Sequence, residues 1–466
     1  MKTFDRVLFL AYYFPPLGGG GTQRTLKFVR YLPEFGWQPH VLTVRDAHYL
    51  VNDKSLLQDI PPDLPITATP AFLPARFFRK ALNHPPRASN EIQSVMLRAF
   101  SFTKKLFYSF CFIPDEHIGW LPFALRAGKR LLRQRDFKII YSSGLPNTAH
   151  LIAQRLARKT GKPWVADLRD LWDQYPESYN PFGWKWRSRL DDWLERRVLA
   201  RADHLIVVSD EMKRQLLQKL PALSAERITV ITNGYDPNDF VSVTPIRAPN
   251  RFVLLHSGTL FQWRTLQPIL HAMQLLFQNH PECRAQFLLK LLGIVPAAER
   301  EAIRQAGFSE QVETLDYLPY REALAHVRGA DLLLLLIGNL PYAANMLTSK
   351  LFDYLGAQRP ILVIGPKGEI HKFIEREQLG VAFEANEAAL IAETLSRWMR
   401  QWRAQELPDG KTAAPDYQRR HLTERLATIF EAVTARHTHN PDELQPKKNF
   451  VSGFSGLSGY GTGSSD

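Results

Sequence analysis

Short apolar segments with the character of buried strands alternate with helical segments along most of this chain. A strand followed by a helix, repeated many times, is typical of parallel sheets whose faces are covered by helices. The predicted fold class is therefore α/β. Strands are predicted at 7–13, 40–44, 138–142, 164–167, 204–208, 228–232, 252–256, 287–292, 312–317, 332–337, 361–364 and 381–383.

The alternation stops between residues 233 and 250, a stretch rich in Asn, Asp and Pro, and then restarts. A chain of 466 residues is also too long for one ordinary core. We therefore expect two Rossmann-like, doubly wound domains facing each other across a cleft, with ligands beyond the carboxyl ends of the strands. The expected order is a first domain over 1–240, a linker over 241–250, a second domain over 251–405, a C-terminal helix over 406–436 that returns toward the first domain, and a disordered tail over 437–466.

The net charge of +13 is unevenly distributed along the chain. Residues 76–135 hold 12 Lys and Arg against three acidic residues, together with several aromatic side chains. Within this stretch, residues 92–110 keep apolar side chains at helical spacing, which predicts a helix lying on an anionic membrane surface. The alternative is a helix whose apolar stripe packs into its own domain. Nucleic-acid binding is not expected, because no nucleic-acid motif accompanies the basic stretch.

The cysteine content and the lengths of the apolar runs indicate the cellular compartment of the protein. Cys111 and Cys283 lie far apart, which fits a reducing compartment rather than a disulfide framework or a zinc site. The first apolar run is short and reads as a strand rather than a signal peptide. No run reaches the ~18 apolar residues of a transmembrane helix. We therefore expect a cytoplasmic protein, peripheral on the inner face of the cytoplasmic membrane if 92–110 binds lipid.

The segment 348–365 reads as a polar helix start, two helical turns and a buried strand. Ser349 is expected to cap the helix, whose first N–H groups would then face an anion. Lys350, Asp353 and Tyr354 share one helix face. A cation at a helix start and a carboxylate one turn later suit a nucleotide-sugar, with the diphosphate at the helix end and the ribose on the acid. The alternative is an amphipathic helix that exposes Lys350 and Asp353.

The loop after the first predicted strand is rich in glycine and opens the first predicted helix. Glycines let the backbone approach a phosphate or a sugar closely at a helix N-terminus. The pattern is neither a dinucleotide fingerprint nor a P-loop, so a plain tight turn is the alternative. The residues expected to contact an acceptor or phosphate here are Gly19, Gly20, Gly21 and Arg24.

A second loop, from His256 to Arg264, also follows a predicted strand and opens a helix. Gly258 would let phosphates approach the backbone beside Thr259. Arg264 could pair with a diphosphate through two hydrogen bonds. The alternative for Arg264 is a solvated side chain at a helix start.

These segments resemble, in the same order, motifs of the retaining GT-B glycosyltransferases of family four. The stretch 349–360 is similar to the donor-binding helix, commonly Ser-Lys-Leu-Phe-Glu-Tyr-Leu-Ala-Ala-Gly-Arg-Pro in that family. The first glycine-rich loop resembles the family's Tyr-Phe-Pro-Pro, Gly-Gly and Arg, and 256–264 resembles its Ala-Gly-Thr-Leu loop. The segments 114–122 and 164–172 also look like family segments. The resemblance covers roughly residues 1–435.

The chain departs from the family pattern at two positions. The donor motif has a Glu eight residues before the second one, but here Asn345 precedes Asp353. Asn147 stands where the family often has a His, and His150 follows three residues later. Asp167, Arg169 and Asp170 lie just past a predicted strand end, where cleft residues belong, and a structural ion-pair cluster is the alternative.

The resemblance implies transfer of a sugar, with retention, from a nucleotide-sugar to an acceptor, expected to be a lipid-linked intermediate of cell-surface polysaccharide at an anionic membrane. No cofactor is expected, and no metal, because no two Asp are separated by one residue. The alternative is a degenerate GT-B protein that binds nucleotide-sugar or a partner without catalysis. The expected catalytic residues are Arg264, Lys350, Asp353, Asp167 and His150. The expected donor-binding residues are Gly258, Thr259, Arg264, Ser349, Lys350, Asp353, Tyr354 and Asn345.

Overall fold

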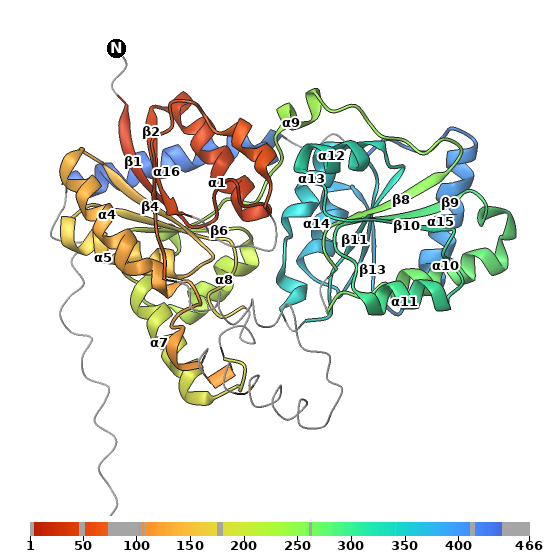
Figure 1. Cartoon of the computed structure of the whole chain (residues 1–466), viewed down its shortest axis with the longest axis horizontal. Helices are drawn as coiled ribbons and strands as arrows, with labels where there is room; N and C mark the ends of the chain where they lie inside the picture. Colours follow the sequence, from red (N-terminus) through yellow and green to blue (C-terminus); the bar gives the residue numbers. More distant parts are fainter. Residues whose placement is uncertain are drawn as a thin grey trace, which may run out of the picture.

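A computed structural model of the chain contains two α/β lobes side by side (Figure 1). The structure describes residues 4–45, 52–72, 102, 105, 106, 109–174, 180–260, 263–340, 342–410 and 415–439. Most of the predicted segment 92–110 and the tail beyond residue 439 lie outside the described residues. No helix in the described ranges is both long enough and apolar enough to cross a membrane.

The first domain is built on a seven-stranded parallel sheet in the order β3-β2-β1-β4-β5-β6-β7. Its strands are β1 (Asp5–Ala11), β2 (Trp37–Val44), β3 (Ile66–Thr69), β4 (Ile139–Gly144), β5 (Trp164–Leu168), β6 (His204–Val207) and β7 (Ile228–Val230). Its helices are α1 (Gly20–Tyr31), α4 (Leu121–Gln134), α5 (Thr148–Thr160), α7 (Lys185–Leu199) and α8 (Asp210–Lys219).

The second domain is built on a six-stranded parallel sheet in the order β10-β9-β8-β11-β12-β13. Its strands are β8 (Phe252–Ser257), β9 (Phe287–Leu292), β10 (Val312–Leu315), β11 (Leu332–Leu336), β12 (Ile361–Ile364) and β13 (Gly380–Phe383). Its helices are α10 (Gln267–Asn279), α11 (Ala297–Gln305), α12 (Tyr320–Gly329), α13 (Ser349–Ala357), α14 (Glu369–Glu377) and α15 (Ala388–Arg403). A short helix, α9 (Pro237–Val241), connects the domains.

These two sheets confirm the predicted GT-B architecture. Every predicted strand is present, and β3 is an additional edge strand that the sequence analysis did not identify. Successive residues of a strand point to opposite faces, so both faces of each sheet carry apolar side chains. In β1, Leu8 and Leu10 belong to one core cluster, whereas Val7 and Phe9 belong to another.

The last helix, α16 (Arg419–His439), lies in the first domain although it follows the whole of the second (Figure 1). Its buried side chains Leu422, Leu426 and Phe430 pack in the same cluster as Val7 and Phe9 of β1. The chain therefore passes between the domains twice, through α9 and again before α16. The helix runs to His439, three residues beyond the predicted end.

Candidate functional site

A cavity of ≈ 510 Å³ lies between the two domains. Its lining comes from loops that follow β1, β4, β5, β6 and β7 in the first domain and β8, β9, β10 and β11 in the second. Ligands of doubly wound sheets bind beyond the carboxyl ends of the strands, and this cavity joins those ends from both sheets. Of the predicted site residues, it is lined by Gly19, Gly20, Gly21, Gly258, Thr259, Arg264, Asn345, Ser349 and Lys350.

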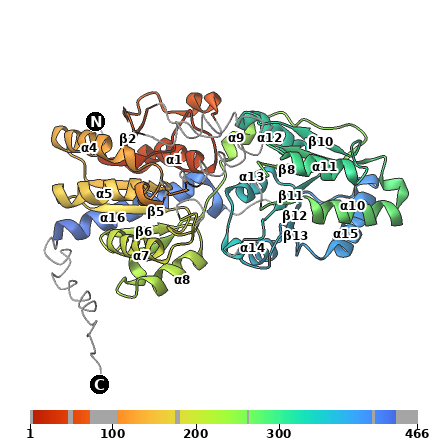
Figure 2. The ribbon, with the colours of Figure 1, turned by 60° about the horizontal axis from the view of Figure 1, so that its bottom comes forward.

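One wall of the cavity is the start of α13, on the side of the second domain that faces the first (Figure 2). The helix begins at Ser349, and its N-cap is Thr348, whose side chain accepts a hydrogen bond from the backbone N–H of Lys350 (3.2 Å). The prediction that Ser349 caps the helix was wrong by one residue. Both Ser349 and Lys350 still line the cavity.

Lys350 lies directly over the loop that follows β8. Gly258 has a φ of 134°, and a Cβ at this position would overlap the Lys350 ammonium, so only glycine fits here. Burial and the nearby charge of Arg264 together lower the pKa of Lys350 to about 7, although the carboxylate of Asp353 opposes the shift. Two cations and a helix N-terminus thus meet on one wall, which favours an anionic ligand.

Tyr354, a predicted donor-binding residue, does not line the cavity. Its side chain is 1% exposed. Its hydroxyl accepts a hydrogen bond from the Ser257 N–H (2.8 Å) and donates one to the Leu334 carbonyl (3.1 Å). Tyr354 therefore fixes the loop that carries Gly258 rather than contacting a ligand in this arrangement.

Asp353 also lies outside the cavity lining. Its carboxylate accepts a hydrogen bond from the Tyr320 hydroxyl (3.2 Å). Burial, only partly offset by the charge of Arg419 and by the Tyr320 hydrogen bond, raises the pKa of Asp353 to about 6. The predicted ribose acceptor thus faces the contacts between the domains, one helical turn beneath Lys350.

The glycine-rich loop of the first domain forms the opposite wall. Gly19 is the N-cap of α1, with a φ of 98°. A Cβ at Gly20 would overlap the Ser349 hydroxyl of the second domain, and a Cβ at Gly21 would overlap the guanidinium of Arg169. Glycine at these positions lets the two walls approach each other closely.

Arg24 and Asp167 form an ion pair in the interior of the first domain, and both are 0% exposed. Arg24 donates to both carboxylate oxygens at 2.8 Å and also to the carbonyls of Thr232 (2.7 Å) and Ile231 (3.0 Å). Asp167 accepts a further hydrogen bond from the Tyr141 hydroxyl (2.6 Å). The structure thus favours the alternative weighed for this segment, a structural ion pair, because β5 continues through Asp167 and buries its side chain beneath α1.

His150 is fully buried and does not line the cavity. Its Nδ1 lies 2.8 Å from the Ser142 hydroxyl, and burial lowers the pKa of its imidazole to about 4. The ring is therefore neutral near pH 7 and packs beneath the backbone of Gly144, where a Cβ would overlap it. The structure thus places this expected catalytic residue in the domain interior rather than at the cavity.

Two residues of the 167–170 segment, Arg169 and Asp170, do line the cavity. Arg169 donates to the carbonyl oxygens of Gly144 and Leu145, the latter at 2.6 Å. Tyr317 and Tyr342, from loops after β10 and β11, also line the cavity and were not predicted. Neither loop has a recognisable motif, so nothing in the sequence indicated these two tyrosines.

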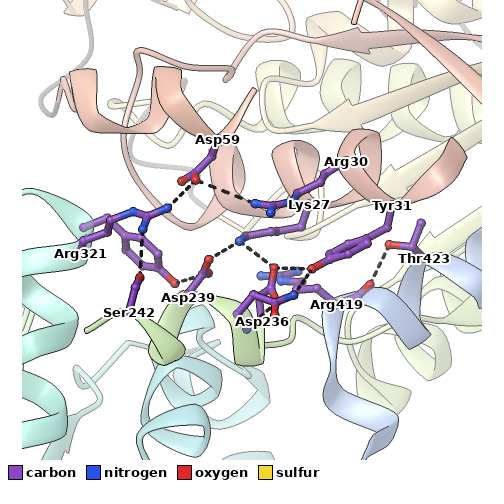
Figure 3. A network of polar contacts seen from close by, with 12 residues as sticks. Lys27, Arg30, Tyr31, Asp59, Asp236, Asp239, Ser242, Arg321, Arg419 and Thr423 are labelled. Carbon is purple, nitrogen blue, oxygen red and sulfur yellow. Dashed lines mark hydrogen bonds and ion pairs between the residues drawn. The ribbon is translucent and has the colours of Figure 1, made fainter. Parts of the chain in front are cut away.

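A polar network ties α1 of the first domain to the connecting helix α9 (Figure 3). The ammonium of Lys27 pairs with Asp236 (2.8 Å) and with Asp239, and the Tyr31 hydroxyl donates to Asp236 (2.8 Å). All of these side chains except that of Tyr31 are at most 5% exposed. A buried lysine with two carboxylate partners holds α1 against the connection between the domains.

The second domain joins the same region through α12. The Tyr320 hydroxyl lies within hydrogen-bond distance of Asp239 (3.4 Å) as well as Asp353, and its backbone N–H donates to Asp53 (2.9 Å) of the first domain. Arg321 pairs with Asp59, also of the first domain (2.8 Å; Figure 3). These contacts fix the relative position of the two cavity walls.

Comparison with known proteins agrees with this geometry. Residues 19–234 match the family described as "Glycosyl transferase 4-like domain". No curated protein matches the sequence significantly. Sucrose-phosphate synthase from Thermosynechococcus elongatus is similar in structure, with a TM-score of 0.56 and 12% identity over 93% of this chain and 97% of that one.

Two further solved structures share the fold. HepE from Anabaena, solved in complex with UDP-glucose, has a TM-score of 0.54 and 14% identity over 93% of this chain and 98% of that one. A glycosyltransferase from Rickettsia africae has a TM-score of 0.53 and 12% identity over 95% of this chain and 98% of that one. The match over residues 19–234 and the shared architecture show that the chain has the GT-B fold and that its first domain is similar to the glycosyl transferase 4-like family.

Proposed function

We propose that this protein transfers a sugar from a nucleotide-sugar to an acceptor bound in the interdomain cavity. The observation that carries the proposal is the composition of that cavity. It combines Arg169, Arg264 and Lys350 with a helix N-terminus, and Asp170 is the only acidic residue among the described residues of its lining. Such a site stabilises phosphate groups, and the negative charge that develops on a leaving diphosphate.

In this proposal the donor binds with its diphosphate at the start of α13. Lys350 and Arg264 supply two cations, Gly258 lets the phosphates approach, and the N–H groups that begin α13 supply further donors. The structural similarity to HepE, which was solved with UDP-glucose, supports a nucleotide-sugar in the corresponding position. Asn345 and Thr259 lie within reach of the same ligand on the cavity wall.

Retention of configuration is part of the proposal and rests on the family resemblance. Attack on the same face as the departing diphosphate lets that phosphate accept the proton of the acceptor hydroxyl, so no protein nucleophile is needed. The protein then contributes position and charge: Arg264 and Lys350 lower the energy of the separating diphosphate. No metal is assigned to this step.

The acceptor is proposed to be a lipid-linked sugar of cell-surface polysaccharide at an anionic membrane. The described residues of the predicted membrane helix include Phe102, Leu106 and Phe110, which are 58%, 36% and 55% exposed. Exposed aromatic side chains in a stretch of high positive charge support contact with lipid headgroups. A cytoplasmic protein bound peripherally to the membrane would meet this requirement.

The second candidate, a nucleotide-sugar-binding protein without catalysis, is supported by Asn345. This amide lines the cavity where the family motif has its first carboxylate. Donor turnover separates the two candidates. Incubation with a panel of UDP-, GDP-, ADP- and CDP-sugars should release nucleoside diphosphate slowly without acceptor and faster with one. Binding of a nucleotide-sugar without release under either condition would favour the non-catalytic candidate.

A further inference from the structure

Arg169 is a cation on the first-domain wall of the cavity, across from Arg264 and Lys350. We propose that Arg169 recognises an anionic group, a phosphate or carboxylate, on the acceptor. This inference rests on the proposed function and deepens it, because it assigns the acceptor a chemical class. A neutral sugar hydroxyl alone would then be a poor acceptor.

The side chain of Arg169 is held in a fixed position. Its Nε donates to the Gly144 carbonyl, its Nη2 donates to the Leu145 carbonyl (2.6 Å), and its guanidinium lies 5.8 Å from the centre of the Tyr13 ring. Tyr13 lines the same cavity. A guanidinium oriented by three partners loses little conformational freedom when it binds an anion.

The remaining nitrogen, Nη1, occupies the space beside Gly21 where a Cβ would otherwise lie. Among the described residues, the hydrogen bonds of Arg169 come from Nε and Nη2, which leaves Nη1 to donate to a ligand. Within the described parts of the chain, no carboxylate lies within ion-pair distance of Arg169, although Asp170 is its neighbour in sequence and also lines the cavity. Arg24 contrasts with it, because Arg24 is neutralised by Asp167 at 2.8 Å.

Arg169 also lies apart from the two cations assigned to the donor. A nucleotide-sugar diphosphate carries two negative charges, and Arg264 and Lys350 on the second-domain wall supply two positive ones. Arg169 belongs to the loop after β5 on the opposite wall and is not needed for this balance. Because desolvated charges are costly unless paired, a cation on this wall with no ion-pair partner among the described residues favours an anionic group on the other substrate.

The test titrates acceptor probes into protein saturated with the nucleoside diphosphate that binds best. The probes are glucose, glucose 6-phosphate and citronellyl phosphate, so that a sugar phosphate and a lipid phosphate are compared with a neutral sugar. We expect at least one phosphate probe to bind tenfold or more tightly than glucose. Arg169→Ala should abolish that preference while nucleotide affinity changes less than twofold. Arg304→Ala, at an exposed position of the second domain, is the matched control.

A second variant keeps the test decisive if Arg169→Ala is poorly folded. Arg169→Gln retains an amide that can donate to the Gly144 or Leu145 carbonyl but carries no charge, and it should lose the phosphate preference equally. An unchanged preference in a folded variant contradicts the inference. A loss of nucleotide affinity as large as that of Arg264→Ala would instead make Arg169 part of the donor site. If wild-type protein binds no nucleotide at all, the proposed function fails, and the inference with it.

Discussion

At the scale of single residues, the ammonium of Lys350 has the least ordinary environment in the cavity. Burial and the charge of Arg264 lower its pKa to about 7, so the free protein holds it only partly protonated near neutral pH. A bound diphosphate would favour the charged form and raise the pKa again. Nucleotide binding should therefore be coupled to uptake of a proton above pH 7.

The affinity for nucleoside diphosphate is accordingly predicted to fall as the pH rises above 7, by up to about tenfold per unit. Below pH 7 the lysine is already charged, and the affinity should level off. Calorimetry in two buffers of different ionisation enthalpy measures the proton uptake directly. Lys350→Met should remove this pH dependence, and wild-type affinity that stays constant from pH 7 to 9 would contradict the assignment.

The buried pair of Arg24 and Asp167 leads to a prediction about stability. Arg24→Met leaves a buried carboxylate without its cation and should lower the free energy of unfolding by about 3–5 kcal/mol. Arg196→Met, which breaks an exposed pair with Asp192, should cost less than about 1 kcal/mol. Urea unfolding compares the two variants. Equal small losses would mean that the Arg24 pair does not anchor α1.

At the scale of elements, the strands and the positions of the loops could be predicted from the sequence, but the direction of single side chains could not. The segment 167–170 was identified as a cleft segment, yet β5 extends one residue further than predicted. Asp167 lies within the strand and is buried against Arg24 of α1, and Arg169, beyond the strand end, reaches the cavity instead. Helix starts carry a similar one-residue ambiguity, because Thr348 and Ser349 are equally plausible caps until the backbone is known.

The start of α13 gives a prediction that separates these two hydroxyls. Thr348→Ala removes the acceptor for the Lys350 N–H and should destabilise the second domain by about 1 kcal/mol, whereas Thr348→Ser should preserve it. Ser349→Ala should leave stability nearly unchanged. Chemical unfolding of the three variants checks this order. A larger loss of unfolding free energy for Ser349→Ala than for Thr348→Ala would mean that Ser349 is the N-cap.

At the scale of the whole molecule, the family match and the two sheets agree with the sequence prediction, but the contacts that join the domains were not foreseen. The pairing of Lys27 with Asp236 and Asp239, more than two hundred residues away, depends on how the chain returns through α9. No local pattern marks such partners. Together with Tyr320 and Arg321 they set the spacing between Gly20 and Ser349 across the cavity.

Helix α16 gives the corresponding prediction for the whole chain. A chain ending at residue 418 would lose the buried Leu422, Leu426 and Phe430 and expose the face of the first sheet that they cover. Deleting side chains of this size from a core costs about 2–5 kcal/mol each, so the first domain should not fold. A chain ending at residue 439 is the control. The two chains are compared by soluble expression and by thermal melting. A cooperative melt of the chain ending at residue 418 would show that α16 is dispensable.

The central claim is that the start of α13 and the loop after β8 hold the diphosphate of a nucleotide-sugar. The most direct measurement is calorimetric titration of nucleoside diphosphates into wild-type protein, Lys350→Ala, Arg264→Ala and the exposed control Arg304→Ala. Loss of one charge-assisted hydrogen bond is worth about 1.5–3 kcal/mol, so each cavity variant should bind roughly 10- to 150-fold more weakly, with the control unchanged. Folded Lys350→Ala and Arg264→Ala proteins that bind as tightly as wild type would contradict the account.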